Sequence, residues 1–373
     1  MANFAFIYTP SEAWIGGKNY YLSLFSKLHD DLDSTLDTVT IFTADTLHIE
    51  DLKSFNKFKV VQSSLLKSHG IYRLAFRIAN KLFGENSLLT YLFKSHNIDL
   101  LSHAYLPKWT KIKSLPWIPD FQHCVLPEYF SPEKLKYRNR IFKKYLANEN
   151  FLLSSNSALK DARNFFDVKG KAWIYRFTPI SSVNYDDENY KKLCLKMKIP
   201  ESFVFLPNQF WKHKNHILCF KACLEAKNLN EPFNLVCSGG FSDYRDPSYS
   251  DFINNFIEKN NLFENIKLLG LIDRNIFNCF LRDAQVLVNP SKFEGWSTTV
   301  EEGKASNKVM ALSSLNVHKE QTDGYETVEY FDVDDEQGCM YSIQNCLNTA
   351  PINNVSSLGS NDVSIYEILT SIK

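Results

Sequence analysis

The sequence lacks the signatures of several common classes of protein. No window approaches the roughly 18 consecutive apolar residues of a membrane-spanning helix. The first residues show neither the basic region nor the long apolar region of a signal peptide. The eight cysteines form no C-x-x-C pair and have no Cys/His spacing suited to zinc. We therefore expect a cytoplasmic protein with reduced, buried thiols, in which any membrane contact is peripheral.

The chain has no net charge, but its charges are unevenly distributed. Residues 1–180 contain 24 basic and 16 acidic residues, a net charge of +8, so the remaining residues carry −8. A chain of 373 residues usually divides into two domains of roughly 150 to 200 residues. The asymmetry indicates that a basic N-terminal domain and an acidic C-terminal domain face different partners.

Short β-rich runs alternate with stretches of helical periodicity along most of the chain. This pattern predicts parallel sheets covered by helices, so we expect an α/β fold with two doubly wound domains in tandem. The segment 175–190, which contains a proline, serines and an acidic cluster, is the predicted linker. The predicted strands lie within 4–10, 39–44, 58–64, 98–104, 114–120, 150–156, 203–208, 233–240, 266–272, 284–290 and 308–314.

Residues 289–308, NPSKFEGWSTTVEEGKASNK, combine acids, a glycine and hydroxyls directly before a predicted helix. Ser297 or Thr298 is the expected N-cap. A helix N-terminus has unpaired N–H groups and a partial positive charge, which suits a phosphate or diphosphate. Glu294 would point from the turn towards that ligand, and Gly295 would let the backbone approach it. Taken alone, the acids could simply favour the start of a helix.

The same stretch, followed by LSSLNVHKEQ (312–321), resembles the donor-binding signature of the retaining glycosyltransferases of family 4. FVFLPNQFWKHKNH (203–216) and WIPDFQHCVLPEYFS (117–131) also resemble that family, in its bacterial surface-polysaccharide type. The resemblance implies the GT-B fold, with two Rossmann-like domains facing across a cleft. It also implies boundaries at 1–180 for the acceptor-binding domain, 181–354 for the donor-binding domain, and 355–373 for a last helix that returns to the N-terminal domain.

The resemblance further implies a hexosyltransferase-type enzyme that moves a sugar from a UDP- or GDP-sugar to a hydroxyl of a lipid-linked glycan. In that family, the residue at Glu294 contacts the transferred sugar, the residue at Glu302 holds the ribose, and the one at Lys214 neutralises the diphosphate. Glu301 is expected to face solvent. The implied donor-binding residues are Gly17, Gln209, Lys214, Gly239, Leu271, Ser291, Glu294, Gly295, Trp296, Ser297, Thr298, Thr299 and Glu302, with the amides of 296–299 on the diphosphate.

Two positions depart from the family pattern. Gln209 stands where relatives carry an arginine, and Lys212 or Arg176 could supply the missing charge. Relatives also have a His-Asp pair where this chain has a proline followed by Asp120, with His123 three residues later. Asp120 and His123 are both catalytic candidates, although a lone loop histidine is often structural. Gly16 and Gly17 sit at a predicted strand-to-helix loop, but they do not complete a G-x-G-x-x-G motif.

Neither D-x-D triplet, at 31–33 and 332–334, follows a strand as a metal-binding triplet would, so we expect no metal and no cofactor. Two segments, 68–83 and 134–146, are basic and amphipathic. In the first, Arg73, Arg77 and Lys81 recur every four residues, which suits an anionic membrane surface or an ordinary solvated helix face. No nucleic-acid-binding signature accompanies them.

Two other functions remain open. A glycoside hydrolase also uses two carboxylates, but it has no need of a lysine and a helix N-terminus directed at a diphosphate. A non-catalytic nucleotide-sugar or glycan-binding protein on a decayed transferase scaffold would explain the missing arginine and histidine.

Overall fold

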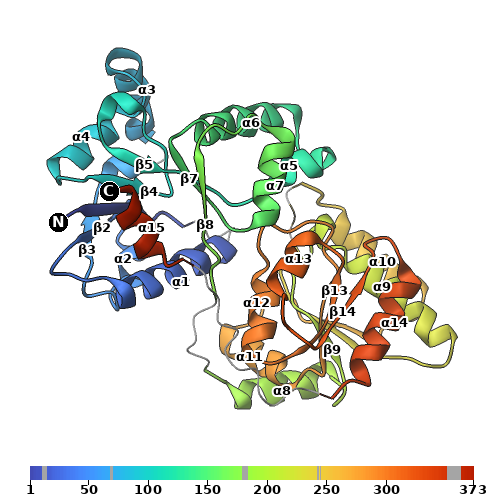
Figure 1. The fold of residues 1–373 in the computed structure, drawn as a ribbon. Helices are drawn as coiled ribbons and strands as arrows, with labels where there is room; N and C mark the ends of the chain where they lie inside the picture. The colour runs from blue at the N-terminus through green and yellow to red at the C-terminus, as the bar shows by residue number, and fades with distance from the viewer. Residues whose placement is uncertain (11–14, 68–69, 179–183, 242, 244, 351–362) are drawn as a thin grey trace. The chain divides into compact units, whose positions relative to one another are not determined.

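The computed structural model describes residues 1–10, 15–67, 70–178, 184–241, 243, 245–350 and 363–373. The chain divides into two compact units (Figure 1). The first comprises Met1–Phe121, Pro132–Ile180 and Asn361–Lys373, and the second comprises Gln122–Ser131 and Ser181–Ser360. The short segment Gln122–Ser131 therefore belongs to the second unit, which differs from the predicted domain at 1–180.

The first unit contains two parallel sheets. Five strands pair in the order β3-β2-β1-β4-β5, and three further strands pair in the order β6-β7-β8. The strands of this unit are β1 (Asn3–Ile7), β2 (Thr38–Thr43), β3 (Lys59–Gln62), β4 (Leu100–Ser102), β5 (Lys113–Leu115), β6 (Trp117–Ile118), β7 (Asn150–Leu153) and β8 (Lys171–Ile174). The prediction of one strand within 114–120 was wrong, because Pro116 separates β5 from β6 and has no N–H to donate to a ladder. Strand β8 was not predicted.

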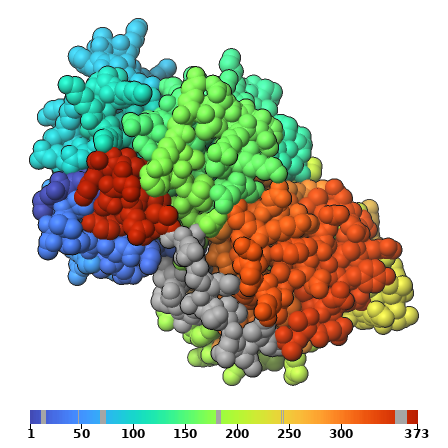
Figure 2. Space-filling model, in the orientation of Figure 1, coloured from blue at the N-terminus to red at the C-terminus, as the bar shows by residue number. Residues whose placement is uncertain are grey.

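Helices surround these sheets. They are α1 (Ile15–Asp31), α2 (Leu47–Glu50), α3 (Gly70–Phe83), α4 (Ser87–Ser95), α6 (Pro132–Leu146), α7 (Asn156–Phe165) and α15 (Ile365–Ile372). Helix α15, at the end of the chain, is tied to the start of the chain by the fully buried Asp37. That carboxylate accepts hydrogen bonds from the Tyr366 hydroxyl at 3.1 Å, the Lys373 ammonium at 2.9 Å and the Ala2 amide at 2.7 Å. Figure 2 shows α15 (red) on the surface of this unit.

The second unit has one six-stranded parallel sheet in the order β11-β10-β9-β12-β13-β14, which is the Rossmann order. Its strands are β9 (Val204–Leu206), β10 (Leu235–Cys237), β11 (Ile266–Leu268), β12 (Val286–Asn289), β13 (Val309–Ser313) and β14 (Val328–Phe331). Strand β14 was not predicted. The strand order reverses between β9 and β12, and ligands of such sheets bind at this reversal, beyond the carboxyl ends of the strands.

Helices of the second unit cover both faces of that sheet. They are α8 (Asp187–Met197), α9 (His216–Asn228), α10 (Tyr249–Lys259), α11 (Arg274–Asp283), α12 (Thr298–Ala305), α13 (Asn316–Gln321) and α14 (Glu336–Leu347). The unit also contains the short helix α5 (Gln122–Val125). The predicted linker 175–190 extends too far, because α8 begins at Asp187 with Asp186 as its N-cap. The central strands β9, β10, β12 and β13 are fully buried, as expected for a parallel sheet covered on both sides, and the edge strands β11 and β14 are only partly buried. All eight cysteines are free, and six of them are buried.

Among the described residues, no helix is both long enough and apolar enough to cross a membrane.

Candidate active site

The loops after β9, β10 and β11 meet at the carboxyl edge of the second sheet. Gly239 has a φ of +143°, and a Cβ at this position would lie 2.2 Å from the carbonyl oxygen of Asn208. Only glycine tolerates both conditions. The Gly239 amide also donates to the carbonyl of Gly270 at 2.9 Å. The structure therefore brings three predicted donor-binding positions, Gln209, Gly239 and Leu271, to neighbouring loops.

Gln209 occupies the position of the family's arginine, but its side chain has a structural contact. Its Oε1 accepts a hydrogen bond from the Gly240 amide at 2.8 Å. The carboxamide therefore links the loops after β9 and β10, and it adds no positive charge. Of the two possible substitutes, Lys212 is ion-paired with Asp246 at 3.3 Å.

Sequence reasoning missed another cation nearby. The guanidinium of Arg245 is mostly buried, donates to Asp243 at 2.9 Å and lies 5.0 Å from the centre of the Trp211 ring. It also donates to Oε1 of Gln122 at 3.2 Å, which attaches the segment 122–131 to this unit. Its position in the loop after β10 was the only available signal in the sequence.

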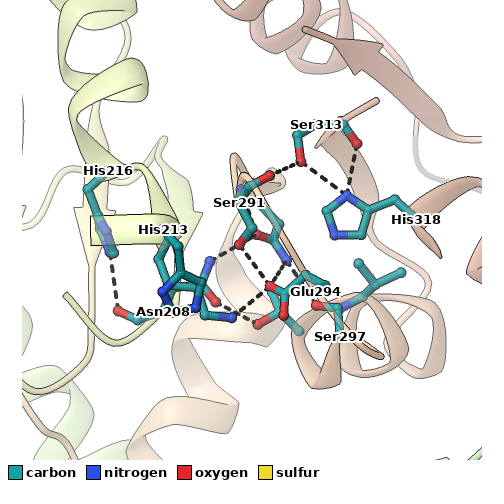
Figure 3. A network of polar contacts seen from close by, with 12 residues as sticks. Asn208, His213, His216, Ser291, Glu294, Ser297, Ser313 and His318 are labelled. Carbon is teal, nitrogen blue, oxygen red and sulfur yellow. Dashed lines mark hydrogen bonds and ion pairs between the residues drawn. The ribbon is translucent and has the colours of Figure 1, made fainter. Parts of the chain in front are cut away.

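Glu294 and Lys214 form an ion pair at the reversal of strand order. Figure 3 shows Glu294 and Ser291 in the network of polar contacts at this place. Lys214 Nζ lies 2.6 Å from Glu294 Oε1, and both side chains are largely buried. The Ser291 hydroxyl lies 2.7 Å from the same carboxylate oxygen and 2.7 Å from Oδ1 of Asn289. Three of the predicted residues, from the loops after β9 and β12, are thus in direct contact.

The charge of Glu294 follows from this setting. Burial by itself raises the pKa of its carboxyl group, but the adjacent Lys214 ammonium and the Ser291 hydroxyl outweigh burial, so that the pKa of Glu294 is lowered. Glu294 is therefore ionised at neutral pH. An anionic carboxylate is a strong acceptor for sugar hydroxyls, and the neighbouring ammonium is a strong donor for phosphate oxygens.

Helix α12 begins as predicted, with Ser297 as the N-cap. The Ser297 hydroxyl accepts from the Val300 amide at 3.4 Å and from Nδ2 of Asn289 at 2.9 Å. The Ser297 amide, however, donates to Oε1 of Gln321 at 3.0 Å. The expectation that all four amides of 296–299 face a diphosphate is therefore wrong for this one, because α13 supplies its acceptor.

The side chains of α12 tie the helix to the rest of the site. Thr299 Oγ1 donates to Oδ1 of Asn208 at 3.1 Å, which joins the helix to the loop after β9. Thr298 is the first residue of the helix, and Gly295 and Trp296 form the turn before it. The carboxyl edge of the sheet therefore holds Ser291, Glu294 and the N-terminus of α12 in one hydrogen-bonded group.

The two acids inside α12 have different surroundings. Glu302 forms an ion pair with Arg274 at 2.7 Å, and it is far less exposed than that arginine. Burial raises the pKa of Glu302, and the Arg274 guanidinium opposes the rise without cancelling it. The expectation that Glu301 faces solvent was wrong. Glu301 is only 4% exposed and accepts from Nε2 of Gln321 at 3.0 Å, because this side of the helix packs on α13.

Arg274 was not singled out from the sequence. Its only signal was its place at the start of α11, just after the loop that follows β11. The ion pair with Glu302 brings it into the predicted ribose-binding region.

Asp120 and His123 fall in different units. Asp120 follows β6 and is ion-paired with Arg138 at 2.8 Å within the first unit. His123 lies in α5 and is almost completely buried.

The prediction that Gly16 and Gly17 lie in a loop was wrong, since both belong to the first turn of α1. Residues 11–14 of that predicted loop lie outside the described residues.

The expectation that neither D-x-D triplet follows a strand was wrong for 332–334, which comes directly after β14. Both triplets are engaged in local contacts. Asp334 is ion-paired with Lys292 at 2.6 Å, and Asp33 accepts from the Thr35 hydroxyl at 2.6 Å. Across the described part of the chain, no group of three or more His, Cys, Asp or Glu side chains is arranged to hold a metal ion.

Sequence comparison does not assign the chain to a family. No family model matches the chain, and no curated protein matches it. Solved structures do match, over nearly the whole length.

Three of these structures illustrate the likeness. A glycosyltransferase from Rickettsia africae is 16% identical, with a TM-score of 0.65 over 93% of this chain and 88% of that one. Anabaena Alr3699/HepE, solved in complex with UDP and glucose, is 12% identical, with a TM-score of 0.66 over 93% and 90%. WaaG, a glycosyltransferase involved in lipopolysaccharide biosynthesis, is 12% identical, with a TM-score of 0.58 over 94% and 91%. Together with the parallel sheets, these matches confirm the predicted GT-B fold with its two Rossmann-like domains.

Proposed function

We propose that this protein is a glycosyltransferase that moves a sugar from a nucleotide-diphosphate donor to a hydroxyl of a glycan. The observation that supports this most directly is the buried Lys214–Glu294 ion pair beside the N-terminus of α12. Sugar transfer needs a cation at the departing diphosphate and an acceptor group for the sugar hydroxyls. This site holds both within 2.6 Å of each other.

Each residue then has a role in the transfer step. Lys214 and the N-terminus of α12 stabilise the charge that develops on the diphosphate, because they are already in place and largely shielded from water. Glu294 orients the sugar through its hydroxyls. Glu302, whose carboxylate form is stabilised by Arg274, accepts from the ribose hydroxyls, which favours a UDP- or GDP-sugar over a deoxyribose donor.

The finer parts of the proposal rest on the family resemblance. They are retention of the anomeric configuration, independence of metal, hexosyl transfer, a lipid-linked acceptor and a role in surface-polysaccharide synthesis at the inner face of the membrane. Of these parts, hexosyl transfer is supported by the complex of Anabaena Alr3699/HepE with UDP and glucose, and the role in surface-polysaccharide synthesis by the role of WaaG in lipopolysaccharide biosynthesis.

A thermal-shift screen with UDP, GDP, dTDP and their sugars tests donor binding. We expect one nucleotide and its sugar to raise the melting temperature, and Glu302→Ala to abolish that shift. An unchanged shift in Glu302→Ala would remove the ribose assignment.

Glu294→Gln should still bind the nucleotide but lose transfer by roughly 100-fold or more. Wild-type turnover in this variant would exclude Glu294 from the reaction.

A second candidate is a non-catalytic nucleotide-sugar or glycan-binding protein. It is favoured by the uncharged Gln209 and by the Ser297 amide, which is already bonded to Gln321. Donor binding without turnover, across a broad panel of donors and glycan acceptors, would support this candidate and exclude the enzyme.

A further inference from the structure

His318, in α13, is a fully buried histidine beside the proposed donor site. Its Nδ1 lies 2.8 Å from the carbonyl oxygen of Ser313 (Figure 3). A carbonyl oxygen can only accept a hydrogen bond, so Nδ1 carries the proton of the neutral ring. The Ser313 hydroxyl, 3.2 Å from the same nitrogen, gives its own hydrogen to the carbonyl of Ser291. Nε2 is therefore the nitrogen that can take up a second proton.

Nε2 of His318 is buried and has no hydrogen-bond partner among the described residues. Buried polar atoms of native proteins are nearly always paired, so this nitrogen requires an explanation. Burial lowers the pKa of His318, and the Lys214 ammonium acts in the same direction. The Glu294 carboxylate and the Ser313 carbonyl oppose them without cancelling their effect. His318 is therefore neutral at pH 7 in the free protein.

Other charged groups around α13 have their own contacts. Glu301, on the side of α12 that packs on α13, accepts from Gln321 and is ion-paired with Lys304 at 3.2 Å. Lys319, on α13 itself, is exposed and lies 5.6 Å from the centre of the Tyr330 ring on β14. Lys214 and Glu294 are therefore the charges whose rearrangement would change the protonation of His318.

The donor site has no surplus of positive charge. Each cation described above at this edge of the sheet is paired with a carboxylate, and Gln209 adds no charge in place of the family's arginine. The pairs are Lys214–Glu294, Lys212–Asp246, Arg245–Asp243 and Arg274–Glu302. The diphosphate of a nucleotide sugar is doubly anionic, and burying it near a neutral imidazole favours protonation of that ring.

We propose that His318 takes up a proton at Nε2 when a nucleotide sugar binds, and that it is thereby a positioning residue of the donor site. This role rests on the proposed function, because it requires a nucleotide-sugar donor. Lys214 turns its ammonium towards the diphosphate, and the His318 imidazolium replaces it as the charge that stabilises Glu294. Glu294 thus stays ionised and continues to accept from the sugar hydroxyls. The proton comes from solvent and returns there when the nucleotide leaves.

His216 is a matched comparison in the same unit. It is fully buried, its Nε2 donates to the Asn208 carbonyl at 3.2 Å, and its Nδ1 has no partner among the described residues. Burial lowers the pKa of His216 to about 3, and the hydrogen bond to Asn208 does not reverse this effect. We therefore expect His216 to stay neutral with and without the donor.

Calorimetric titration of the full chain with UDP-glucose, and separately with GDP-mannose, tests the proposal. Titrations in phosphate and in Tris at equal pH give the number of protons taken up, because the two buffers differ in their heat of ionisation. We expect an uptake of about half a proton or more per bound nucleotide sugar at pH 7. The affinity should fall by about tenfold from pH 6 to pH 8. A nucleotide sugar has no phosphate that titrates in this range, so the protein must bind the proton.

His318→Asn is the decisive variant, because the asparagine amide keeps the bond to the Ser313 carbonyl but has no nitrogen that titrates. It should lose most of the proton uptake. Its affinity should match the wild type at pH 8 and be about tenfold lower at pH 6. His216→Gln keeps the bond to Asn208 and is the matched control, which should take up as much proton as the wild type at equal melting temperature.

NMR of isotope-labelled histidines gives a second measurement, on the wild-type protein. One buried ring should change from its neutral Nδ1–H form to the imidazolium when the nucleotide sugar is added. Binding without proton uptake, or unchanged uptake in His318→Asn, would overturn this role of His318 and leave the proposed donor site intact. If neither nucleotide sugar binds, the proposed function fails together with it.

Discussion

Lys214 Nζ and Glu294 Oε1 lie 2.6 Å apart although the two residues are separated by 80 positions in the sequence. Each follows a strand of the second sheet, and β9 and β12 are neighbours in that sheet. The sheet pairing thereby places Lys214, one of many lysines in the sequence, in contact with Glu294. The pairing of two neighbouring strands therefore places the cation and the acceptor group of the proposed reaction in contact.

This ion pair predicts a coupled stability effect. Lys214→Met leaves the Glu294 carboxylate buried without its cation, so we expect a loss of about 3 kcal/mol in the free energy of unfolding at pH 7. Lys214→Met/Glu294→Gln removes the charge as well and should recover much of that loss. Urea unfolding of the single and double variants measures both. Additive losses would show that the two residues are not coupled in the free protein.

The Lys214–Glu294 pair also predicts how the free energy of unfolding changes with pH. Because Lys214 lowers the pKa of Glu294, the pair stabilises the folded state at pH values above the unfolded pKa of a glutamate. That stability is lost as the pH falls through the folded-state pKa. In Lys214→Met, burial is opposed only by His318 and the Ser291 hydroxyl, so the pKa of Glu294 should rise and this variant should lose less stability than the wild type on acidification.

Arg274 predicts a pH dependence of donor binding. The guanidinium opposes the effect of burial on Glu302, whose pKa is raised even with Arg274 present. In Arg274→Ala the pKa of Glu302 should rise further, so that protonation removes a hydroxyl acceptor as the pH falls. We expect nucleotide affinity to drop more at pH 6 than at pH 8, measured by calorimetric titration.

Arg282, at the other end of α11, supplies the control for that measurement. It is paired with Asp187 and Asp283, outside the proposed site. Arg282→Ala should leave the nucleotide affinity unchanged at both pH values. An equal loss at pH 6 and pH 8 in Arg274→Ala would contradict a role through the charge of Glu302.

Two adjacent glycines predict different costs of substitution. Gly239→Ala would place a Cβ 2.2 Å from the Asn208 carbonyl in a backbone conformation that alanine avoids. We expect it to destabilise the second unit by about 2 kcal/mol or more and to weaken donor binding. In Gly240→Ala the nearest atom is the end of the Gln209 side chain, which can move, so the cost should be smaller. Chemical unfolding of both variants tests the difference, and equal costs would contradict it.

The last helix should depend on one buried carboxylate. Asp37 is fully buried and holds both Tyr366 and Lys373, and their hydrogen bonds lower its pKa against the opposing effect of burial. Asp37→Ala should cost about 3 kcal/mol at pH 7. This contribution should fade as the pH falls below the unfolded pKa of an aspartate. Asp33→Ala, on an exposed neighbour, serves as the control, and a similar loss there would contradict the anchoring role of Asp37.

Much of the fold was predictable from local pattern. The strands of the second sheet up to β13 were located because buried parallel strands appear as short apolar runs. The Ser297 N-cap could also be predicted locally, because a helix cap depends only on the capping residue and the next few residues. Strands β8 and β14 were missed because each lies at the edge of its sheet and is only partly buried, so neither appears as a short apolar run. Pro116 divided a predicted strand in two, and only the sheet pairing revealed this.

For the site as well, some features were predictable from local sequence and others were not. Glu294, Lys214 and Glu302 were selected through the family resemblance, which rests on local stretches of sequence. Which partner each residue meets was decided by tertiary structure, through Arg274 for Glu302, Gln321 for both Glu301 and the Ser297 amide, and Gly240 for Gln209. These partners come from other strands and helices, and no local rule relates them. The sequence by itself determined the elements and the chemically able residues. Their contacts and charges depend on which elements become neighbours when the sheet forms.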